Sequence, residues 1–308
     1  MSSTAVNKNL PTQQIPSSIS EALANLRVAI QNTDKNRDES CWLKTGLADF
    51  DSAFKGLRLG AVTILASRPS MGRSALALNI ATNVGVFQKH PTLYLSLDMP
   101  VWQLTLRIAS LLGEVEVNTL QGGQLTLDQD RRLDRVIGKA QNAPLHLMHY
   151  PYIDMYSLCQ RVREFVQDRN NPDALSLLVI DDLGYADLQV SEVELTAAYE
   201  NAMYLLKDLA ADLNIAILLL SPINSSAEVR ENKRPVFTDL PSVALARMSD
   251  ALLFLYRDEV YNPESENQNK AELIISRDDF GSTGLVYFGV ELKYHRFSNL
   301  QRSEEDSK

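Results

Sequence analysis

Short apolar runs alternate with longer amphipathic segments along most of the chain. An apolar run between polar residues is typical of a buried strand, and apolar positions spaced three and four apart are typical of a helix. The predicted strands span 61–67, 92–97, 145–149, 175–181, 214–221, 251–256, 271–276 and 285–290, and the predicted helices span 74–87, 100–112, 128–140, 155–168 and 193–213. This alternation predicts an α/β fold with a mostly parallel sheet and helices on both faces. The last strands follow one another without helices, which predicts a C-terminal antiparallel extension.

The two ends of the chain are polar. Residues 1–16 are rich in Ser, Thr, Asn, Gln and Pro, and residues 301–308 are rich in charge, so we expect a flexible arm and a charged tail. A helix is predicted for residues 17–32, because a capping box precedes apolar residues at helical spacing, and a polar linker follows up to residue 40. A short helix cannot bury its apolar stripe alone. Two interpretations stay open: it packs on its own domain, or it docks on a neighbouring subunit.

Composition limits the class of protein. The chain has 308 residues, 45% hydrophobic and 22% charged, which is ordinary for a globular protein with one large α/β domain. No apolar run reaches the roughly 18 residues of a membrane span, and no secretory signal is recognisable, so we expect a cytoplasmic protein without a membrane partner. Two cysteines without CxxC spacing indicate neither a disulfide framework nor a zinc site. The net charge of −9 argues against a generally nucleic-acid-coating surface, although a small basic channel could still hold DNA.

One octet between a predicted strand and a predicted helix has the layout of a phosphate-binding loop. It consists of Ser67, Arg68, Pro69, Ser70, Met71, Gly72, Arg73 and Ser74. In such a loop the backbone N–H groups at the helix N-terminus cradle phosphates, a lysine contacts the outer phosphates, and the final hydroxyl holds Mg²⁺. Here Ser67 replaces the first glycine and Arg73 replaces the lysine. Because arginine is planar and bulkier, the octet predicts nucleotide binding but not efficient hydrolysis.

Carboxylates follow two of the predicted strands. The strand 175–181 ends in Asp181 and Asp182, an arrangement that predicts an Mg²⁺ contact from Asp181 at the carboxyl end of the sheet. Asp98 follows the strand 92–97 and is a candidate for polarising the attacking water. A plain Asp turn at 181, or a helix N-cap at Asp98, would explain the same residues without function.

Several motifs together resemble the C-terminal RecA-type domain of DnaB-family replicative helicases. They are 45–51, 67–74, 96–100, Asp181, 233–240 and 256–261, and they occur in family order. The resemblance covers about residues 41–300 and implies a RecA-like P-loop NTPase fold that uses ATP and Mg²⁺. It also implies a hexameric ring that hydrolyses ATP between subunits and moves along single-stranded DNA. Residues 17–32 resemble the linker helix that docks on the adjacent subunit, and we expect no counterpart of the family's primase-binding N-terminal domain.

The chain departs from the family at its functional positions. Asp98 stands where the family has its catalytic glutamate. The aspartate side chain is shorter by one methylene, so the water that it polarises would be misplaced by roughly 1 Å, and such an error can cost about 10²-fold in rate. Arg277 aligns with a lysine presented to the next subunit's ATP, but Asp279 stands at the arginine finger. Pro222 replaces a glutamine that senses the γ-phosphate. The DNA-contacting loop reads Pro241, Ser242, Val243 and Ala244, without the family's arginine and glycine.

These departures favour a DnaB-like nucleotide-binding protein of DNA replication with an impaired ATPase. Such a protein would act by association, through residues 17–32, with copies of itself or with a replicative helicase, and single-stranded DNA is a further candidate partner. The first alternative is an active ATP-dependent helicase, in which Asp182 replaces the water-positioning carboxylate and Arg73 holds phosphate. The second alternative is a regulatory RecA-like ATP sensor.

Overall fold

The computed structural model describes residues 19, 40–168, 174–186, 194–279 and 283–300. The chain divides into two compact units, residues 1–41 and 42–308, and the second contains the central sheet and the helices that cover it. The predicted arm, the predicted helix 17–32 except Ile19, most of the linker and the charged tail lie outside the described residues.

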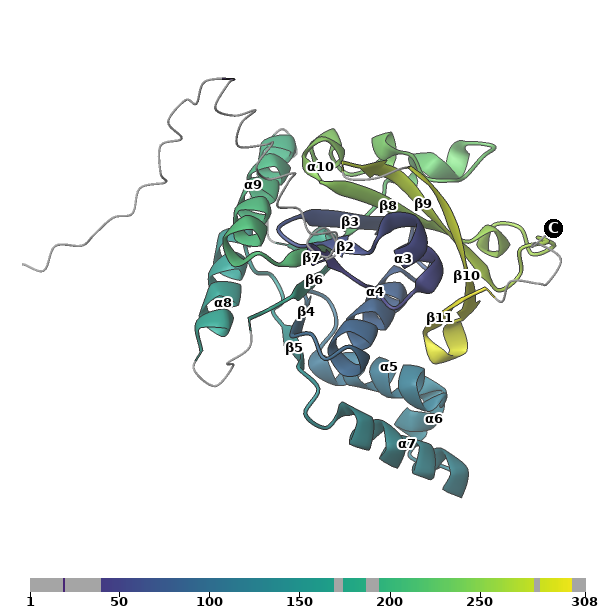
Figure 1. The fold of residues 1–308 in the computed structure, drawn as a ribbon. Coiled ribbons are helices and arrows are strands. Elements are labelled where there is room, and N and C mark those ends of the chain that lie inside the picture. The colour runs from purple at the N-terminus through teal and green to yellow at the C-terminus, as the bar shows by residue number, and fades with distance from the viewer. Residues whose placement is uncertain (1–18, 20–39, 169–173, 187–193, 280–282, 301–308) are drawn as a thin grey trace, which may run out of the picture. The chain divides into compact units, whose positions relative to one another are not determined.

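A nine-stranded sheet forms the centre of this unit, in the order β11-β10-β9-β8-β3-β7-β6-β4-β5 (Figure 1). Its strands are β3 (Val62–Ser67), β4 (Thr92–Ser96), β5 (Leu145–His149), β6 (Leu177–Asp181), β7 (Ala216–Pro222), β8 (Ala251–Tyr256), β9 (Lys270–Asp278), β10 (Gly284–Glu291) and β11 (Arg296–Asn299). The pairs from β8 through β5 are parallel, whereas β8–β9, β9–β10 and β10–β11 are antiparallel. The predicted mostly parallel sheet with an antiparallel C-terminal extension is therefore confirmed.

Helices cover both faces of the sheet, and each face has its own apolar core. The helices are α3 (Ala48–Phe54), α4 (Arg73–Thr82), α5 (Val101–Gly113), α6 (Val117–Gly122), α7 (Leu127–Ala140), α8 (Met155–Gln167), α9 (Leu195–Leu213) and α10 (Val243–Met248). Buried side chains of α3, α4 and α5 form one core with the sheet, and those of α8, α9 and α10 form the other. β3, β4 and β6 are buried along their whole length, which explains their continuous apolar sequences.

The structure adds elements that the sequence pattern did not predict. They are α3, α6, α10, β11 and a small antiparallel pair of β1 (Trp42–Leu43) and β2 (Leu57–Arg58). These pieces are short, so they present too few positions for a periodic pattern to be visible. The predicted helix 74–87 is α4 followed by a π-helical turn, Asn83–Phe87. No helix in the described part of the chain is long and apolar enough to cross a membrane.

The parallel half of the sheet brings four strand ends to one edge. In the register, Ser67 of β3 pairs with Pro222 of β7, and Ser96 of β4 pairs with Asp181 of β6. The segments that follow these residues leave the sheet at the same edge, and this is the edge at which ligands bind in open α/β sheets.

Candidate functional site

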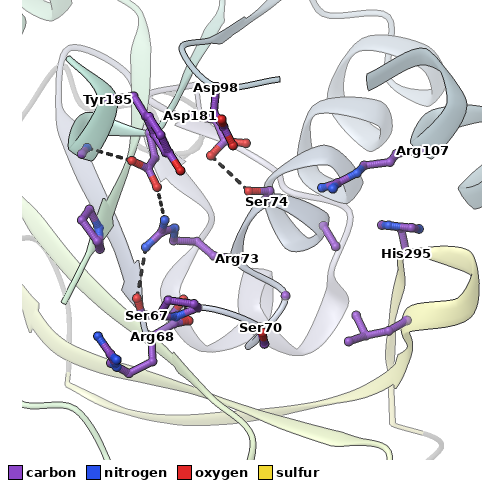
Figure 2. Close-up of a pocket in the computed structure, with 17 residues that line it drawn as sticks. Ser67, Arg68, Ser70, Arg73, Ser74, Asp98, Arg107, Asp181, Tyr185 and His295 are labelled. Atoms are coloured by element: carbon purple, nitrogen blue, oxygen red, sulfur yellow. Dashed lines mark hydrogen bonds and ion pairs between the residues drawn. The ribbon is translucent and has the colours of Figure 1, made fainter. Parts of the chain in front are cut away.

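A cavity of about 640 Å³ opens at this carboxyl edge of the sheet (Figure 2). Its walls come from the 67–74 loop, the segment after β4, the middle of α5, the end of β6 and the turn that follows it, the end of β7 and the turn before β11. The lining residues are Ser67, Arg68, Pro69, Ser70, Gly72, Arg73, Ser74, Ala75, Asp98, Arg107, Asp181, Asp182, Gly184, Tyr185, Pro222, Leu292 and His295. The predicted nucleotide loop and the predicted carboxylates Asp98, Asp181 and Asp182 thus face one cavity.

The loop leads from β3 into the N-terminus of α4. Gly72 is the N-cap of α4, with a φ of 95°, and a Cβ at this position would lie 3.0 Å from the Phe297 ring. A glycine therefore meets both demands, the positive φ and the close approach of the C-terminal strand. Met71 is an exception in the octet, because it is buried in the core and its side chain does not line the cavity. Only its backbone could contact a ligand there.

The Arg73 side chain is held within the protein by three acceptors. Its Nη1 donates to the carbonyl oxygens of Ser67, at 3.1 Å, and of Ser221, and its Nη2 forms an ion pair with Asp182. The pair is largely buried, since the Arg73 and Asp182 side chains are 13% and 9% exposed. Figure 2 shows the guanidinium turned toward the strand ends, not along the open face of the loop. The cation of the loop is therefore bound to the candidate water-positioning carboxylate.

Asp182 has little remaining freedom to act as a base. Besides the ion pair with Arg73, its Oδ1 accepts a hydrogen bond of 2.7 Å from the Gly184 amide and caps the turn Leu183–Tyr185. Burial raises the pKa of Asp182 above its usual value, the Arg73 cation opposes this rise, and the Asp98 carboxylate adds to it. A general base needs a free lone pair aimed at its proton. Both oxygens of Asp182 already have partners.

Ser74 and Asp181 are arranged as a pair of hard oxygen ligands. The Ser74 hydroxyl donates to Asp181 Oδ1 at 3.1 Å, and the Tyr94 hydroxyl donates to Asp181 Oδ2 at 2.6 Å. Burial raises the pKa of Asp181, and the hydrogen bonds from Tyr94 and Ser74 partly offset it. Mg²⁺ in nucleotide sites is held by one or two protein oxygens together with phosphates and waters. The donor set therefore fits Mg²⁺ brought by a nucleotide, whereas no cluster of three or more His, Cys, Asp or Glu suited to a metal occurs in the described ranges.

Asp98 is exposed and faces the cavity from the end of β4. The alternative that Asp98 caps a helix is wrong, because α5 starts at Val101 with Pro100 as its N-cap and without a side-chain cap. Ser96 fixes this turn instead, since its hydroxyl accepts a hydrogen bond of 2.8 Å from the Met99 amide. The Asp98 carboxylate is also the main cause of the raised pKa of Tyr185, which lines the same cavity.

Arg107 and His295 line the cavity but were not predicted from the sequence. Figure 2 shows them on the far side of Ser74 from Arg73. Burial lowers the pKa of His295, and the Arg107 charge lowers it further. His295 Nδ1 is buried and has no hydrogen-bond partner among the described atoms. An isolated Arg on a helix and a His before a short strand give no local sequence signal for such a site.

Comparison with known proteins gives the family. The model of the DnaB-like helicase C-terminal domain matches residues 42–299. The chain belongs to this family. It is 31% identical over 284 residues to the replicative DNA helicase DnaB of Geobacillus stearothermophilus, covering 88% of this chain and 60% of that protein. It is 28% identical over 289 residues to the replicative DNA helicase DnaC of Bacillus subtilis, covering 90% of this chain and 61% of that protein. The chain thus spans about three fifths of the length of these relatives.

Solved structures of the DnaB-like family agree with the RecA-like fold. One of them, an isolated ATPase domain, matches with a TM-score of 0.81 and 25% identity, covering 93% of this chain and 100% of that chain. A second, described as a DnaB-like replicative helicase and its interactions with primase, matches with the same TM-score and identity and covers 93% of this chain and 68% of that chain. The RecA-like arrangement predicted from the motifs is confirmed.

Two residues predicted to act on a neighbouring subunit's nucleotide lie outside the cavity. Arg277 Nε and Nη2 donate to the two carboxylate oxygens of Asp279, at 2.8 and 3.0 Å. Its Nη1 donates to the carbonyl oxygens of Ala246 and Arg247, at 2.6 and 2.7 Å, near the C-terminal end of α10. Arg277 is therefore paired with Asp279, the residue that the resemblance places at the arginine-finger position.

The segment predicted as a DNA-contacting loop is the start of a helix. Ser242 is the N-cap of α10 and its hydroxyl accepts a hydrogen bond of 3.2 Å from the Ala244 amide. Ala244 is buried, Pro241 is half-buried, and Val243 is 55% exposed. The expectation of a loop is thus corrected: the Ser242 hydroxyl is used as a helix cap, and only Val243 presents a largely exposed side chain.

Proposed function

We propose that this DnaB-like domain belongs to DNA replication, binds ATP or ADP with Mg²⁺ in the cavity of Figure 2, and hydrolyses ATP poorly. It would act by ring or partner association with a replicative helicase or with copies of itself. The observation that carries the proposal is the buried ion pair between Arg73 and Asp182. This ion pair occupies both the cation of the predicted phosphate loop and the carboxylate that directly follows β6.

Three features support weak hydrolysis. Arg73 is already satisfied by three acceptors, so stabilising a transferring phosphoryl group would require exchanging partners during the reaction. Asp98 remains as the water-polarising carboxylate, with the reach of an aspartate in place of a glutamate. Asp279 stands where the family has an arginine finger, and it forms an ion pair with Arg277. An arginine finger raises the rate of related phosphoryl transfers by about 10³–10⁵-fold.

Association is supported by sequence outside the described residues and by the family. The predicted helix 17–32 would dock on a neighbouring subunit, joined by the linker 33–40 to the RecA-like domain 41–300. Single-stranded DNA is a further candidate ligand of the assembly, near Val243 at the start of α10. A cytoplasmic location is part of the proposal, in keeping with the replicative helicases to which the chain is similar.

An active helicase is the second candidate, and specific contacts favour it. Ser74 and Asp181 keep a hydroxyl and a carboxylate 3.1 Å apart where Mg²⁺ would be held, and the exposed Asp98 faces the same cavity. If the Arg73 ion pair opens when nucleotide binds, these residues would suffice for slow turnover.

ATP turnover with and without single-stranded DNA tests the proposal. We expect turnover at least about 10²-fold below that of a DnaB-family helicase assayed in parallel, with little stimulation by DNA. Mixing the protein with that helicase should yield a co-eluting complex and altered unwinding. DNA-stimulated turnover within tenfold of the helicase would contradict the impaired ATPase and support the second candidate. Absence of both co-elution and any effect on unwinding would reject the partner role.

A further inference from the structure

The contacts of Arg73 also bear on which nucleotide the cavity prefers. A guanidinium has five N–H groups in a fixed plane. Two on Nη1 are used by the Ser67 and Ser221 carbonyls, and one on Nη2 is used by Asp182. Arg73 Nε is buried and has no partner among the described atoms. A buried donor without a partner is uncommon and usually indicates a ligand or water that completes it.

The donors of Arg73 are mostly paired or buried. Nη1 and Nη2 are held by the two carbonyls and by Asp182, and Nε is buried, so a phosphate in the cavity reaches Nε only if the side chain moves. The backbone N–H groups at the N-terminus of α4 bind the inner phosphates in this type of loop, while the basic residue contacts the outer ones. In its observed position Arg73 therefore stays with Asp182, and the backbone N–H groups of the loop would bind an inner pair of phosphates without it.

A third phosphate would meet negative charge. Beyond Arg73 lies Asp182, whose carboxylate is 9% exposed, and Asp181 and Asp98 line the same end of the cavity. Figure 2 shows that the other basic side chain of the cavity's far wall, Arg107, lies across Ser74 from this end. A terminal phosphate here would gain no free side-chain cation from the described cavity lining at this end. Mg²⁺ near Ser74 and Asp181 would offset part of the negative charge, but the phosphate would still approach Asp182 at like charge.

We propose that the cavity selects a nucleoside diphosphate over a triphosphate, and that the Arg73–Asp182 ion pair is the selecting element. This inference rests on the proposed nucleotide binding. Asp182 acts as a specificity residue: it holds Arg73 back and repels a terminal phosphate. The triphosphate binds only when the pair opens, and that opening weakens its apparent affinity.

Calorimetric titration of the full chain with ADP and with adenosine β,γ-imidotriphosphate, each with Mg²⁺, tests this inference. We expect the wild-type protein to bind ADP about tenfold more tightly than the triphosphate analogue, a difference on the scale of one like-charge contact in a partly exposed site. Asp182→Asn should bring the ratio of the two affinities close to one, mainly by tighter binding of the analogue. Asp212→Asn is the matched control, because it removes one carboxylate from an exposed ion pair between Asp212 on α9 and Arg163 on α8, and it should keep the wild-type ratio.

Arg73→Lys provides a second variant if Asp182→Asn does not fold. A lysine cannot hold Asp182 and two carbonyls with one planar group, so it should also lower the preference for ADP. Equal or tighter wild-type binding of the triphosphate analogue would overturn the inference, as would an unchanged ratio in a folded Asp182→Asn or Arg73→Lys protein. Wild-type protein that binds neither nucleotide would instead reject the proposed nucleotide site itself.

Discussion

Replacing Asn79 with alanine should loosen the wall of the candidate nucleotide cavity and destabilise the whole domain. Asn79 is buried on α4, and its Nδ2 donates to the carbonyl oxygens of Ala75 at 2.7 Å and His295 at 2.6 Å. Its Oδ1 accepts a hydrogen bond of 3.0 Å from the Phe297 amide. One side chain therefore joins the helix of the phosphate loop to the turn that carries His295.

The size of the effect follows from the groups that lose their partner. The Ala75 carbonyl already accepts the helical hydrogen bond of residue 79, so its loss is small. The His295 carbonyl and the Phe297 amide have no such replacement, and a buried unpaired group costs about 1–3 kcal/mol. His295 is half-buried and can recruit water, which places the sum near about 3 kcal/mol. At about 2–4 °C per kcal/mol for a domain of this size, the melting temperature should fall by about 6–12 °C.

Thermal unfolding by calorimetry measures this directly, and Asn83→Ala is the matched control. Asn83 lies one turn further along the chain, and its Nδ2 makes one 3.1 Å hydrogen bond to the Thr45 carbonyl, so its loss should cost about 1 kcal/mol. An Asn79→Ala protein that melts within about 2 °C of Asn83→Ala would show that the three hydrogen bonds of Asn79 contribute little. The C-terminal turn would then be held by packing alone.

Three further predictions concern the loop and the buried carboxylates. Gly72→Ala should lower the unfolding free energy by about 2 kcal/mol and weaken nucleotide binding, because Gly72 has a positive φ and an added Cβ would lie 3.0 Å from the Phe297 ring. Unchanged denaturation curves and unchanged nucleotide titrations would contradict this prediction. Burial alone would raise the pKa of Asp239, but hydrogen bonds from Arg230, the Val236 amide and Ser226 hold this pKa below its usual value. Asp239 therefore stabilises the protein at pH values above its unfolded-state pKa, and this stabilisation is lost as pH falls through its folded-state pKa. Asp239→Asn should therefore cost about 2 kcal/mol at pH 7 and flatten the acid limb in urea unfolding measured from pH 3 to 7. Burial raises the pKa of Asp181, so the stability of the protein falls as pH rises from the unfolded-state pKa of Asp181 to its folded-state pKa. Without Mg²⁺, the Asp181→Asn protein should therefore melt at a higher temperature than the wild type at pH 7. A lower melting temperature would argue that the hydrogen bonds from Tyr94 and Ser74 outweigh the desolvation of Asp181.

Much of the fold was predictable because its signals are local. The strands of the parallel half are buried on both faces and therefore carry continuous apolar runs, such as 177–180 in β6. The long helices α8 and α9 bury one face each and show the matching spacing. The short α10 was not predicted, and the resemblance placed a DNA-contacting loop at its start. Pro241 and Ser242 give no local signal against a loop, because both suit a turn as well as a helix start.

Local sequence was enough to specify the alternation of strands and helices, the phosphate-loop octet and the carboxylates that follow β4 and β6. Each of these depends on neighbouring residues, through burial pattern, loop chemistry and motif order. Which of these groups meet was decided only in the folded chain. Arg73 and Asp182 are separated by 109 positions, yet they form a buried ion pair because β3 and β6 flank β7 and end at one edge. Side chains that are distant along the chain become partners only in the folded state, and this pairing makes Arg73, the cation of the predicted phosphate loop, an internal counter-ion.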